Sequence, residues 1–351
     1  MYIPGRLFLH ENIGDVIGTE STDCLSFPDG SKHGFGAVLT RQGEEFLDLA
    51  RKRTIGFGVS GNLTPTTLSY GIIGKTLETL KQLPAFFDAS GLEVSQHFAT
   101  SKDGTRIPYF QVSRKELKLD GTNSTLLYGY GGFEIAETPK YSAGVGRAWL
   151  TQGGVYVVAN IRGGGEYGPR WHQAALKEKR HRAYEDFAAV AEDLIARKVT
   201  SAKRLGALGG SNGGLLMGNM ITLYPQLFGA IVCQAPLLDM QRYSKLLAGA
   251  SWMAEYGDPD KPEEWAFIRT FSAYHNVKPG AKYPPVLFTS STRDDRVHPG
   301  HARKMMAKMK DMGFDVRYYE NVEGGHSGAA DNAQTAHMNA LAYTFLRQKL
   351  K

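Results

Sequence analysis

A serine stands among glycines in the segment Leu205-Gly-Ala-Leu-Gly-Gly-Ser-Asn-Gly-Gly214, in the pattern Gly209-x-Ser211-x-Gly213. A short apolar run precedes this serine, and a helix-forming run follows it. A sharp turn between a strand and a helix exposes a serine hydroxyl, and its strained backbone needs small neighbours. The bare pattern is common by chance, but the strand before it, the helix after it and the flanking glycines indicate a nucleophile for acyl transfer.

A serine needs a neighbouring base to act as a nucleophile, and the base needs an acid that orients it. In folds that expose a serine on such a turn between a strand and a helix, the acid and then the histidine follow the serine along the chain. Each of them lies on a loop after a strand. The predicted strand Val286–Thr289 leads to Asp294, and the predicted strand Val316–Tyr319 leads to His326. We therefore predict that these two residues complete a triad with the serine. From the residues alone, Asp295 remains a competing acid.

Strands that alternate with helices must position these side chains. From residue 94 onwards, apolar runs of strand length alternate with amphipathic runs of helix length. Such alternation packs as a mostly parallel sheet flanked by helices, an α/β-hydrolase fold. We expect an antiparallel hairpin of the first two strands at one edge. The predicted strands are Val94–Ala99, Ile107–Val112, Thr125–Tyr128, Val155–Ile161, Leu205–Leu208, Ala230–Cys233, Val286–Thr289 and Val316–Tyr319, and the predicted helices are Ala143–Leu150, Tyr184–Arg197, Gly213–Leu223, Ala302–Asp311 and Ala333–Gln348.

The composition is that of a soluble globular protein, with 42% hydrophobic and 22% charged residues. The formal net charge is +6, but basic and acidic residues are interleaved, so we expect a solvated surface and no nucleic-acid partner. The two cysteines are Cys24 and Cys233; the second lies in an apolar run, which predicts a buried thiol and no disulfide framework. No secretory pattern or membrane-spanning stretch stands out, so we expect a cytoplasmic protein without a membrane partner.

Four motifs, one of which is the serine segment itself, are characteristic of this sequence. They are Leu127-Tyr-Gly-Tyr-Gly-Gly-Phe133, Ala159-Asn-Ile-Arg-Gly-Gly-Gly-Glu-Tyr-Gly168, Gly209-Gly-Ser-Asn-Gly-Gly214 and Asp294-Asp-Arg-Val297. With these motifs, the sequence from about Ser101 to its end resembles the catalytic domain of the prolyl oligopeptidase family. The resemblance implies that Asp294, and not Asp295, is the acid of the triad. It also implies that the Tyr130 hydroxyl and the backbone N–H of Asn212 bind the oxyanion.

The resemblance further implies a pocket for the residue before the cleaved bond, where a proline ring would stack on Trp252. Phe133, Tyr256 and Val297 would line the same pocket, and Arg296 would bind a carbonyl of the substrate backbone. Trp252 and Tyr256 are four residues apart, so they would share a face if their segment is helical. An aromatic slot suits a flat proline ring, although core aromatics are the plainer interpretation without the resemblance.

The residues before the catalytic domain are too few for the β-propeller that family members normally carry. We expect residues 1–65 to form an irregular N-terminal segment with one short helix near Glu44–Arg53, and residues 66–351 to form the catalytic domain. A domain without a propeller would have an open active site. We therefore expect the segment to serve as a lid or as a dimerisation arm, the latter implying a homo-oligomer.

Three weaker signals receive plainer interpretations. Gly163-Gly-Gly-Glu-Tyr-Gly168 with Asp186 fits a dinucleotide fingerprint, but it opens a predicted loop at Pro169 rather than a helix. His298 and His301 lack a third ligand of suitable spacing, so we interpret them as exposed loop histidines and expect no metal. The basic run 177–182 lacks interleaved aromatic residues and is interpreted as a solvated face.

Together these features predict a serine hydrolase that needs no metal or organic cofactor. The expected substrate is a short peptide with proline before the cleaved bond. A carboxylesterase acting on small esters is the alternative enzyme, and a non-catalytic interaction module is the alternative from another class.

Overall fold

The computed structural model describes residues 8–9, 38–39, 54–72 and 76–351. By its internal contacts the chain divides into two units, one of residues 1–88 with 138–143 and one of residues 89–137 with 144–351. The first unit thus extends past residue 65, where the sequence-based boundary lies. The helix expected near Glu44–Arg53 and Cys24 lie outside the described residues, as does most of the N-terminal segment. Its expected role as a lid or arm stays a prediction.

The first unit contains a three-stranded antiparallel sheet of β3 (Thr54–Val59), β4 (Thr67–Ile72) and β5 (Glu78–Gln82). Two short strands, β1 (Phe8–Leu9) and β2 (Val38–Leu39), pair in parallel. The sequence-based description of residues up to about 60 as irregular was therefore wrong for β3. Its sequence is Thr-Ile-Gly-Phe-Gly-Val, in which two glycines weaken the strand pattern of the β-branched and aromatic residues.

The second unit is built on an eight-stranded sheet in the order β13-β12-β11-β10-β8-β9-β7-β6. All neighbours from β13 to β9 pair in parallel, whereas β7 is antiparallel to both β9 and β6. The predicted strands and the hairpin at the edge are confirmed. The strands are β6 (Leu92–Thr100), β7 (Arg106–Arg114), β8 (Thr125–Gly129), β9 (Val155–Ala159), β10 (Leu205–Gly210), β11 (Ala230–Gln234), β12 (Val286–Ser291) and β13 (Val316–Asn321).

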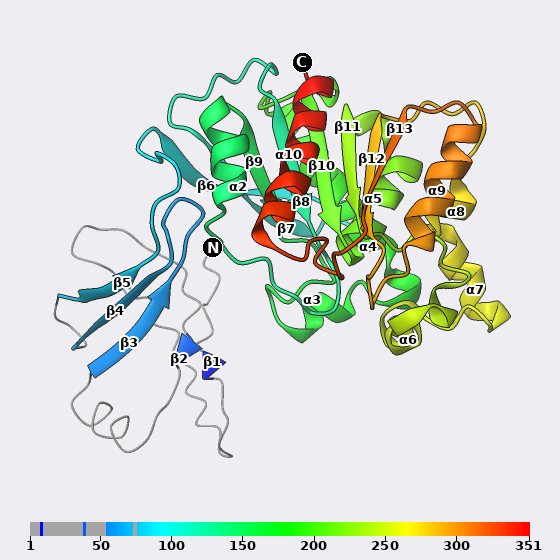
Figure 1. The fold of residues 1–351 in the computed structure, drawn as a ribbon, viewed down its shortest axis with the longest axis horizontal. Coiled ribbons are helices and arrows are strands. Elements are labelled where there is room, and N and C mark those ends of the chain that lie inside the picture. The colour runs from blue at the N-terminus through cyan, green and yellow to red at the C-terminus, as the bar shows by residue number, and fades with distance from the viewer. Residues whose placement is uncertain (1–7, 10–37, 40–53, 73–75) are drawn as a thin grey trace. The chain divides into compact units, whose positions relative to one another are not determined.

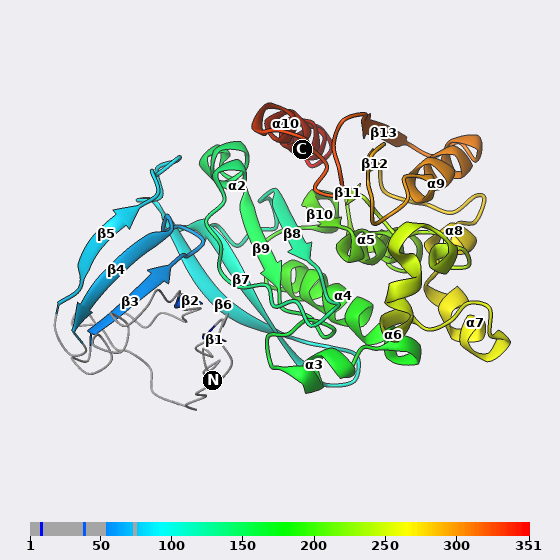
Figure 2. The ribbon, with the colours of Figure 1, turned by 60° about the horizontal axis from the view of Figure 1, so that its bottom comes forward.

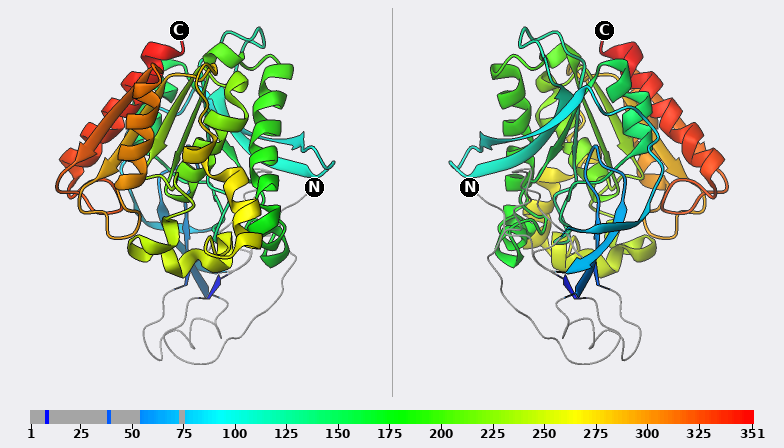
Figure 3. Two further views of the ribbon diagram at one scale, coloured as in Figure 1. Left: turned by 90° about the vertical axis from the view of Figure 1, so that its right-hand side faces the viewer. Right: turned by 90° about the vertical axis from the view of Figure 1, so that its left-hand side faces the viewer.

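Helices cover both faces of this sheet, which confirms the α/β-hydrolase fold. The helices α2 and α10 lie on one side, and α4 and α5 lie on the other (Figures 1 and 2). The side views show α10, in red, separated from α4 by the strands (Figure 3). The five predicted helices are confirmed as α2 (Ala143–Ala148), α4 (His181–Ala196), α5 (Asn212–Leu223), α9 (Gly300–Asp311) and α10 (Asn332–Lys349), and short helices not predicted are α3 (Pro169–Gln173), α6 (Met253–Tyr256), α7 (Pro262–Ile268) and α8 (Ala273–Asn276).

The parallel strands bring their carboxyl ends to one edge of the sheet. Tyr130 directly follows β8, and Ser211 directly follows β10. Asp294 lies on the loop after β12, and His326 lies on the loop after β13. This edge is where ligands bind in open parallel sheets, because the loops there converge. The fold therefore gathers side chains that are up to 196 positions apart in the sequence, as the numbers of Tyr130 and His326 show.

No helix in the described part of the chain is both long enough and apolar enough to span a bilayer.

Candidate active site

Ser211 lies on a strained turn between β10 and α5. Its φ of 59° is in the left-handed region, which non-glycine residues rarely adopt and which costs about 1–3 kcal/mol. Its backbone N–H donates to the carbonyl of Gln234 in β11 at 2.9 Å, and this bond anchors the turn to the sheet. A Cβ at Gly209 would lie only 2.4 Å from the carbonyl oxygen of Gly213, so this position needs glycine. The turn thus has the geometry that the sequence predicted for a nucleophile elbow.

The three residues predicted as a triad are joined by a continuous line of hydrogen bonds. His326 Nε2 lies 3.0 Å from Ser211 Oγ, and His326 Nδ1 lies 2.9 Å from Asp294 Oδ2. Both distances lie within the range needed for proton transfer between positioned side chains. The His326 side chain is 18% exposed and that of Asp294 is 1% exposed. Solvent therefore reaches the histidine but not the acid.

Asp294 is held by its own loop as well as by the histidine. The backbone N–H groups of Arg296 and Val297 each donate to Asp294 Oδ1 at 2.9 Å. Burial raises the pKa of the Asp294 carboxyl, but the hydrogen bonds from His326 and from these two N–H groups outweigh it, so the net pKa lies below the usual value. Asp295, the competing acid, has an exposed side chain, and His326 Nδ1 is hydrogen-bonded to Asp294 instead.

The two groups expected to bind an oxyanion, from Tyr130 and Asn212, lie next to the serine. The Tyr130 hydroxyl lies beside the Ser211 side chain. Burial raises the pKa of Tyr130 above its usual value, and the Ser211 hydroxyl and the charge of Arg180 partly offset this rise. Asn212 is the first residue of α5, and the first N–H groups of a helix have no acceptor within the helix.

The residues expected to form a proline pocket come from three segments. The rings of Phe133 and Tyr256 are 5.6 Å apart and meet edge to face. Tyr256 is fully buried, whereas Trp252 and Phe133 are half-buried. Trp252 ends a 3₁₀ helix, Leu247–Trp252, and Tyr256 ends α6, so the segment is helical but changes its winding between them.

The remaining two expected contacts lie on the Asp294 loop. Val297 is buried, and the Arg296 side chain is exposed. The backbone N–H of each is committed to Asp294. The structure thus brings both next to the triad.

Sequence reasoning missed a buried ion pair behind the serine. Arg180 is fully buried, and its Nη1 donates to Glu255 Oε1 at 2.9 Å. The interpretation of the basic run 177–182 as a solvated face is therefore wrong for this residue. Arg180 lies in a charged stretch that looks exposed, and the only indirect signal is the acidic residue directly before Tyr256.

Two other interpretations also need correction. The segment after Gly168 is the short helix α3, with Pro169 at its first position, and not a loop. Asp186 forms an ion pair with Arg162, whose Nε and Nη2 donate to Oδ2 and Oδ1 at 2.9 and 2.6 Å. A Cβ at Gly163 would lie 2.4 Å from the carbonyl oxygen of Gly131. These glycines thus serve close packing of two loops rather than a phosphate.

His301 is likewise not an exposed loop histidine. It is buried in α9, and its Nδ1 accepts from the backbone N–H groups of Leu238 and Asp239. Burial lowers its pKa to about 4, so the ring is neutral at pH 7. Over the described residues, no group of three or more His, Cys, Asp or Glu side chains is arranged to hold a metal ion. The buried thiol predicted at Cys233 is confirmed.

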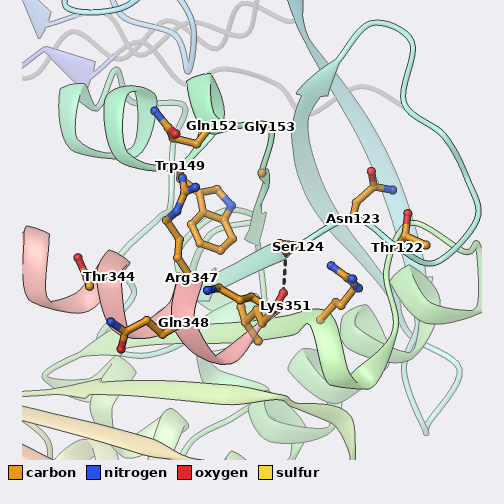
Figure 4. Close-up of a pocket in the computed structure, with 13 residues that line it drawn as sticks. Thr122, Asn123, Ser124, Trp149, Gln152, Gly153, Thr344, Arg347, Gln348 and Lys351 are labelled. Carbon is orange, nitrogen blue, oxygen red and sulfur yellow. Dashed lines mark hydrogen bonds between the residues drawn. The ribbon is translucent and has the colours of Figure 1, made fainter.

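A surface pocket of about 660 Å³ lies away from this site (Figure 4). Its lining includes residues just before β8, β9 and β10, so it opens at the amino edge of the sheet. Ser124 Oγ donates there to the carbonyl of Leu350 at 2.8 Å. No residue of the predicted triad lines this pocket, which is therefore separate from the candidate active site.

Comparison with known proteins gives a consistent result. A family profile described as the prolyl oligopeptidase family matches residues 142–351. An uncharacterized peptidase of Sinorhizobium fredii is 56% identical over 292 residues, which cover 83% of this chain and 40% of the relative. A prolyl endopeptidase of Elizabethkingia miricola is 37% identical over 283 residues, which cover 80% of this chain and 38% of the relative. The chain thus spans about two fifths of the length of these relatives.

A solved structure agrees with this result. A post-proline cleaving enzyme from Rickettsia typhi is 39% identical with a TM-score of 0.80, and the match covers 86% of this chain and 44% of that one. The family profile covers more than half of this chain, and its range includes the serine turn and both loops that carry the acid and the histidine. We conclude that the chain belongs to the prolyl oligopeptidase family.

Proposed function

We propose that this chain carries the catalytic machinery of a serine peptidase that cleaves short peptides after proline. Ser211 is the nucleophile, His326 is the base and Asp294 is the orienting acid. The observation that carries this assignment is the unbroken line of hydrogen bonds from Ser211 Oγ through His326 to Asp294.

One side chain is assigned to each step of the proposed acyl transfer. Ser211 Oγ attacks the substrate carbonyl carbon while His326 Nε2 accepts the serine proton. The imidazolium then donates this proton to the leaving amine, which leaves an acyl group on the serine. Water attacks the acyl group with His326 again as base, and the serine is restored. Asp294 accepts the hydrogen bond of Nδ1–H throughout and stabilises the charged imidazolium.

The Tyr130 hydroxyl and the Asn212 N–H are proposed to bind the oxyanion. Tyr130→Phe should lower kcat by about 10²- to 10³-fold with little change in KM, because the lost bond strengthens only as charge develops. Steady-state kinetics on a proline anilide would measure this. Tyr319→Phe, which removes a hydroxyl from β13, is the matched control. Equal effects of the two substitutions would contradict the assignment.

The proline preference rests on the aromatic residues beside the serine. Phe133 and Tyr256 provide an edge-to-face pair, and we propose that a proline ring lies against this pair, Trp252 and Val297. We expect Arg296, whose side chain is exposed, to bind a carbonyl of the substrate backbone. The names of the Elizabethkingia and Rickettsia relatives support the same preference.

The decisive experiment compares kcat/KM for a blocked Gly-Pro anilide, its Gly-Ala analogue and a short-chain p-nitrophenyl ester. We expect the proline anilide to exceed the alanine analogue by at least about tenfold, which is the usual discrimination by an apolar pocket. Turnover of the ester alone would replace the peptidase by a carboxylesterase. A folded chain that turns over none of the three would favour the interaction module.

A further inference from the structure

A buried cation lies directly behind the proposed oxyanion site. The Arg180 side chain is 0% exposed, and its guanidinium lies 5.3 Å from the centre of the Tyr256 ring. A buried charge is costly unless it is paired and hydrogen-bonded. The two Nη atoms of Arg180 meet this condition with the carboxylate of Glu255 and with Asn212 Oδ1, whereas its buried Nε has no hydrogen-bond partner. Arg180 therefore connects Glu255, its ion-pair partner, to Asn212, the residue that follows the nucleophile.

The side chain of Asn212 connects Arg180 to the proposed oxyanion donors. Its Oδ1 accepts from Arg180 and also from the Tyr256 hydroxyl, at 2.8 Å. Its Nδ2 donates to the carbonyl oxygen of Tyr130 at 2.6 Å. The amide is thus held from both ends. One side chain fixes the backbone of both proposed donors, Asn212 itself and Tyr130.

Glu255 extends the same network to the proposed pocket. Its Oε1 accepts from the backbone N–H of Phe133 at 3.0 Å as well as from Arg180. Its Oε2 lies 2.7 Å from His172 Nε2. Glu255 is only 4% exposed, so its negative charge depends on these partners. Without Arg180, a poorly compensated anion would remain near the place where the substrate oxygen becomes negative.

The two charges act on Tyr130 in opposite directions. The positive charge of Arg180 lowers the pKa of the Tyr130 hydroxyl, and the negative charge of Glu255 raises it. A hydroxyl with a lower pKa is a stronger hydrogen-bond donor to an oxyanion. The geometry and the charges therefore agree that the cation favours the proposed transition state.

We propose that Arg180 is the positioning residue of the oxyanion hole, which holds Asn212 in place and offsets the charge of Glu255 so that the site favours a developing negative charge. This inference rests on the proposed function, because it needs Ser211 to attack a carbonyl. It assigns to Arg180 an effect on the transition state rather than on substrate binding.

The test uses the whole chain with Arg180→Met and the double variant Arg180→Met/Glu255→Gln. Lys179→Met removes a neighbouring exposed cation and is the matched control. The readouts are kcat and KM for a blocked Gly-Pro anilide and the inhibition constant of a peptide aldehyde ending in proline. Ser211 Oγ adds to the aldehyde carbon, its proton moves to His326, and the carbonyl oxygen becomes an oxyanion.

We expect Arg180→Met to lower kcat by about a hundredfold, the lower end of the loss for a removed donor, and to change KM less than about threefold. The aldehyde should bind about a hundredfold more weakly, in parallel with kcat. The double variant should recover at least about tenfold of the loss, because it also removes the unpaired anion. Lys179→Met should leave all three quantities unchanged.

A change in KM alone, or a double variant no better than the single one, would overturn the role of the charge. If Arg180→Met does not fold, the double variant decides the matter, since it leaves no unpaired buried charge. Its kcat should lie about threefold to tenfold below that of the wild type with KM changed less than about threefold, because Arg180 no longer holds Asn212, and a kcat equal to that of the wild type or a change in KM alone would overturn the inference. A wild type that cleaves the anilide while Arg180→Met matches it overturns this inference alone, whereas an inactive wild type overturns the proposed function and the inference together.

Discussion

Ser211→Ala should lower kcat for a proline anilide by on the order of 10⁶-fold, the loss typical of a removed triad nucleophile. The reason is that alanine leaves His326 Nε2 without the hydroxyl that lies 3.0 Å away, so no acyl group can form on the enzyme. The strained turn should persist, since the anchoring bond of residue 211 to the Gln234 carbonyl comes from its backbone. KM should change little, because the hydroxyl contributes little to binding of the ground state.

Two measurements would check this result. Steady-state kinetics give kcat, and a fluorophosphonate label that reacts with activated serines reports the nucleophile directly. Ser201→Ala, just before the amino end of β10, is the matched control and should keep both activity and label. Labelling that persists in Ser211→Ala would assign the nucleophile to another serine.

The elements that carry the triad could be predicted from the sequence because their signals are local. The central strands β8, β9 and β11 are short apolar runs, and buried parallel strands of this kind can be recognised without information about their partners. The turn at Ser211 is also local, since its glycines and the residues around it are contiguous. The position of the acid and the histidine at the same edge as the serine then follows from the direction of the parallel strands.

The features that could not be predicted depend on contacts between distant residues. Arg180 and Glu255 are 75 positions apart, and each looks like a surface charge within its own segment. His301 lies at the start of α9, shortly before Arg303 and Lys304, so nothing local indicates that it accepts two backbone N–H groups of another loop. In β3 and α3, glycine and proline argued against regular structure, although proline is well suited to the first turn of a helix.

Asp294→Asn should lower kcat by about 10⁴-fold, and the reason lies in the hydrogen-bond pattern. The backbone N–H groups of Arg296 and Val297 both donate to Oδ1, so the amide oxygen of asparagine must take that position. The amide NH₂ then replaces Oδ2, which lies 2.9 Å from His326 Nδ1. An NH₂ group there can only donate, and the oxygen at the Oδ1 position, 3.0 Å from Nδ1, already accepts from two backbone N–H groups, so the substitution favours the tautomer in which Nδ1 accepts and Nε2 carries the proton. In that tautomer His326 cannot accept the serine proton.

Asp295→Asn is the matched control, because it makes the same chemical change one residue further on, at an exposed side chain. It should leave kcat within about threefold of the wild type, as expected for a surface carboxylate with no part in the triad. A large loss in Asp295→Asn with normal activity in Asp294→Asn would exchange the two assignments. Comparable losses in both would indicate that the loop, and not one carboxylate, determines the activity.

The same substitution should also change how stability depends on pH. The pKa of Asp294 in the folded protein is lowered, so its carboxylate stabilises the fold above the unfolded value of about 3.9 and loses this effect as the pH falls through the folded value. Asparagine does not titrate. The free energy of unfolding of Asp294→Asn should therefore fall less steeply than that of the wild type below about pH 4, measured by urea denaturation. Parallel curves for the two proteins would mean that the carboxylate is no more stabilised by His326 and its loop in the folded state than by water in the unfolded chain.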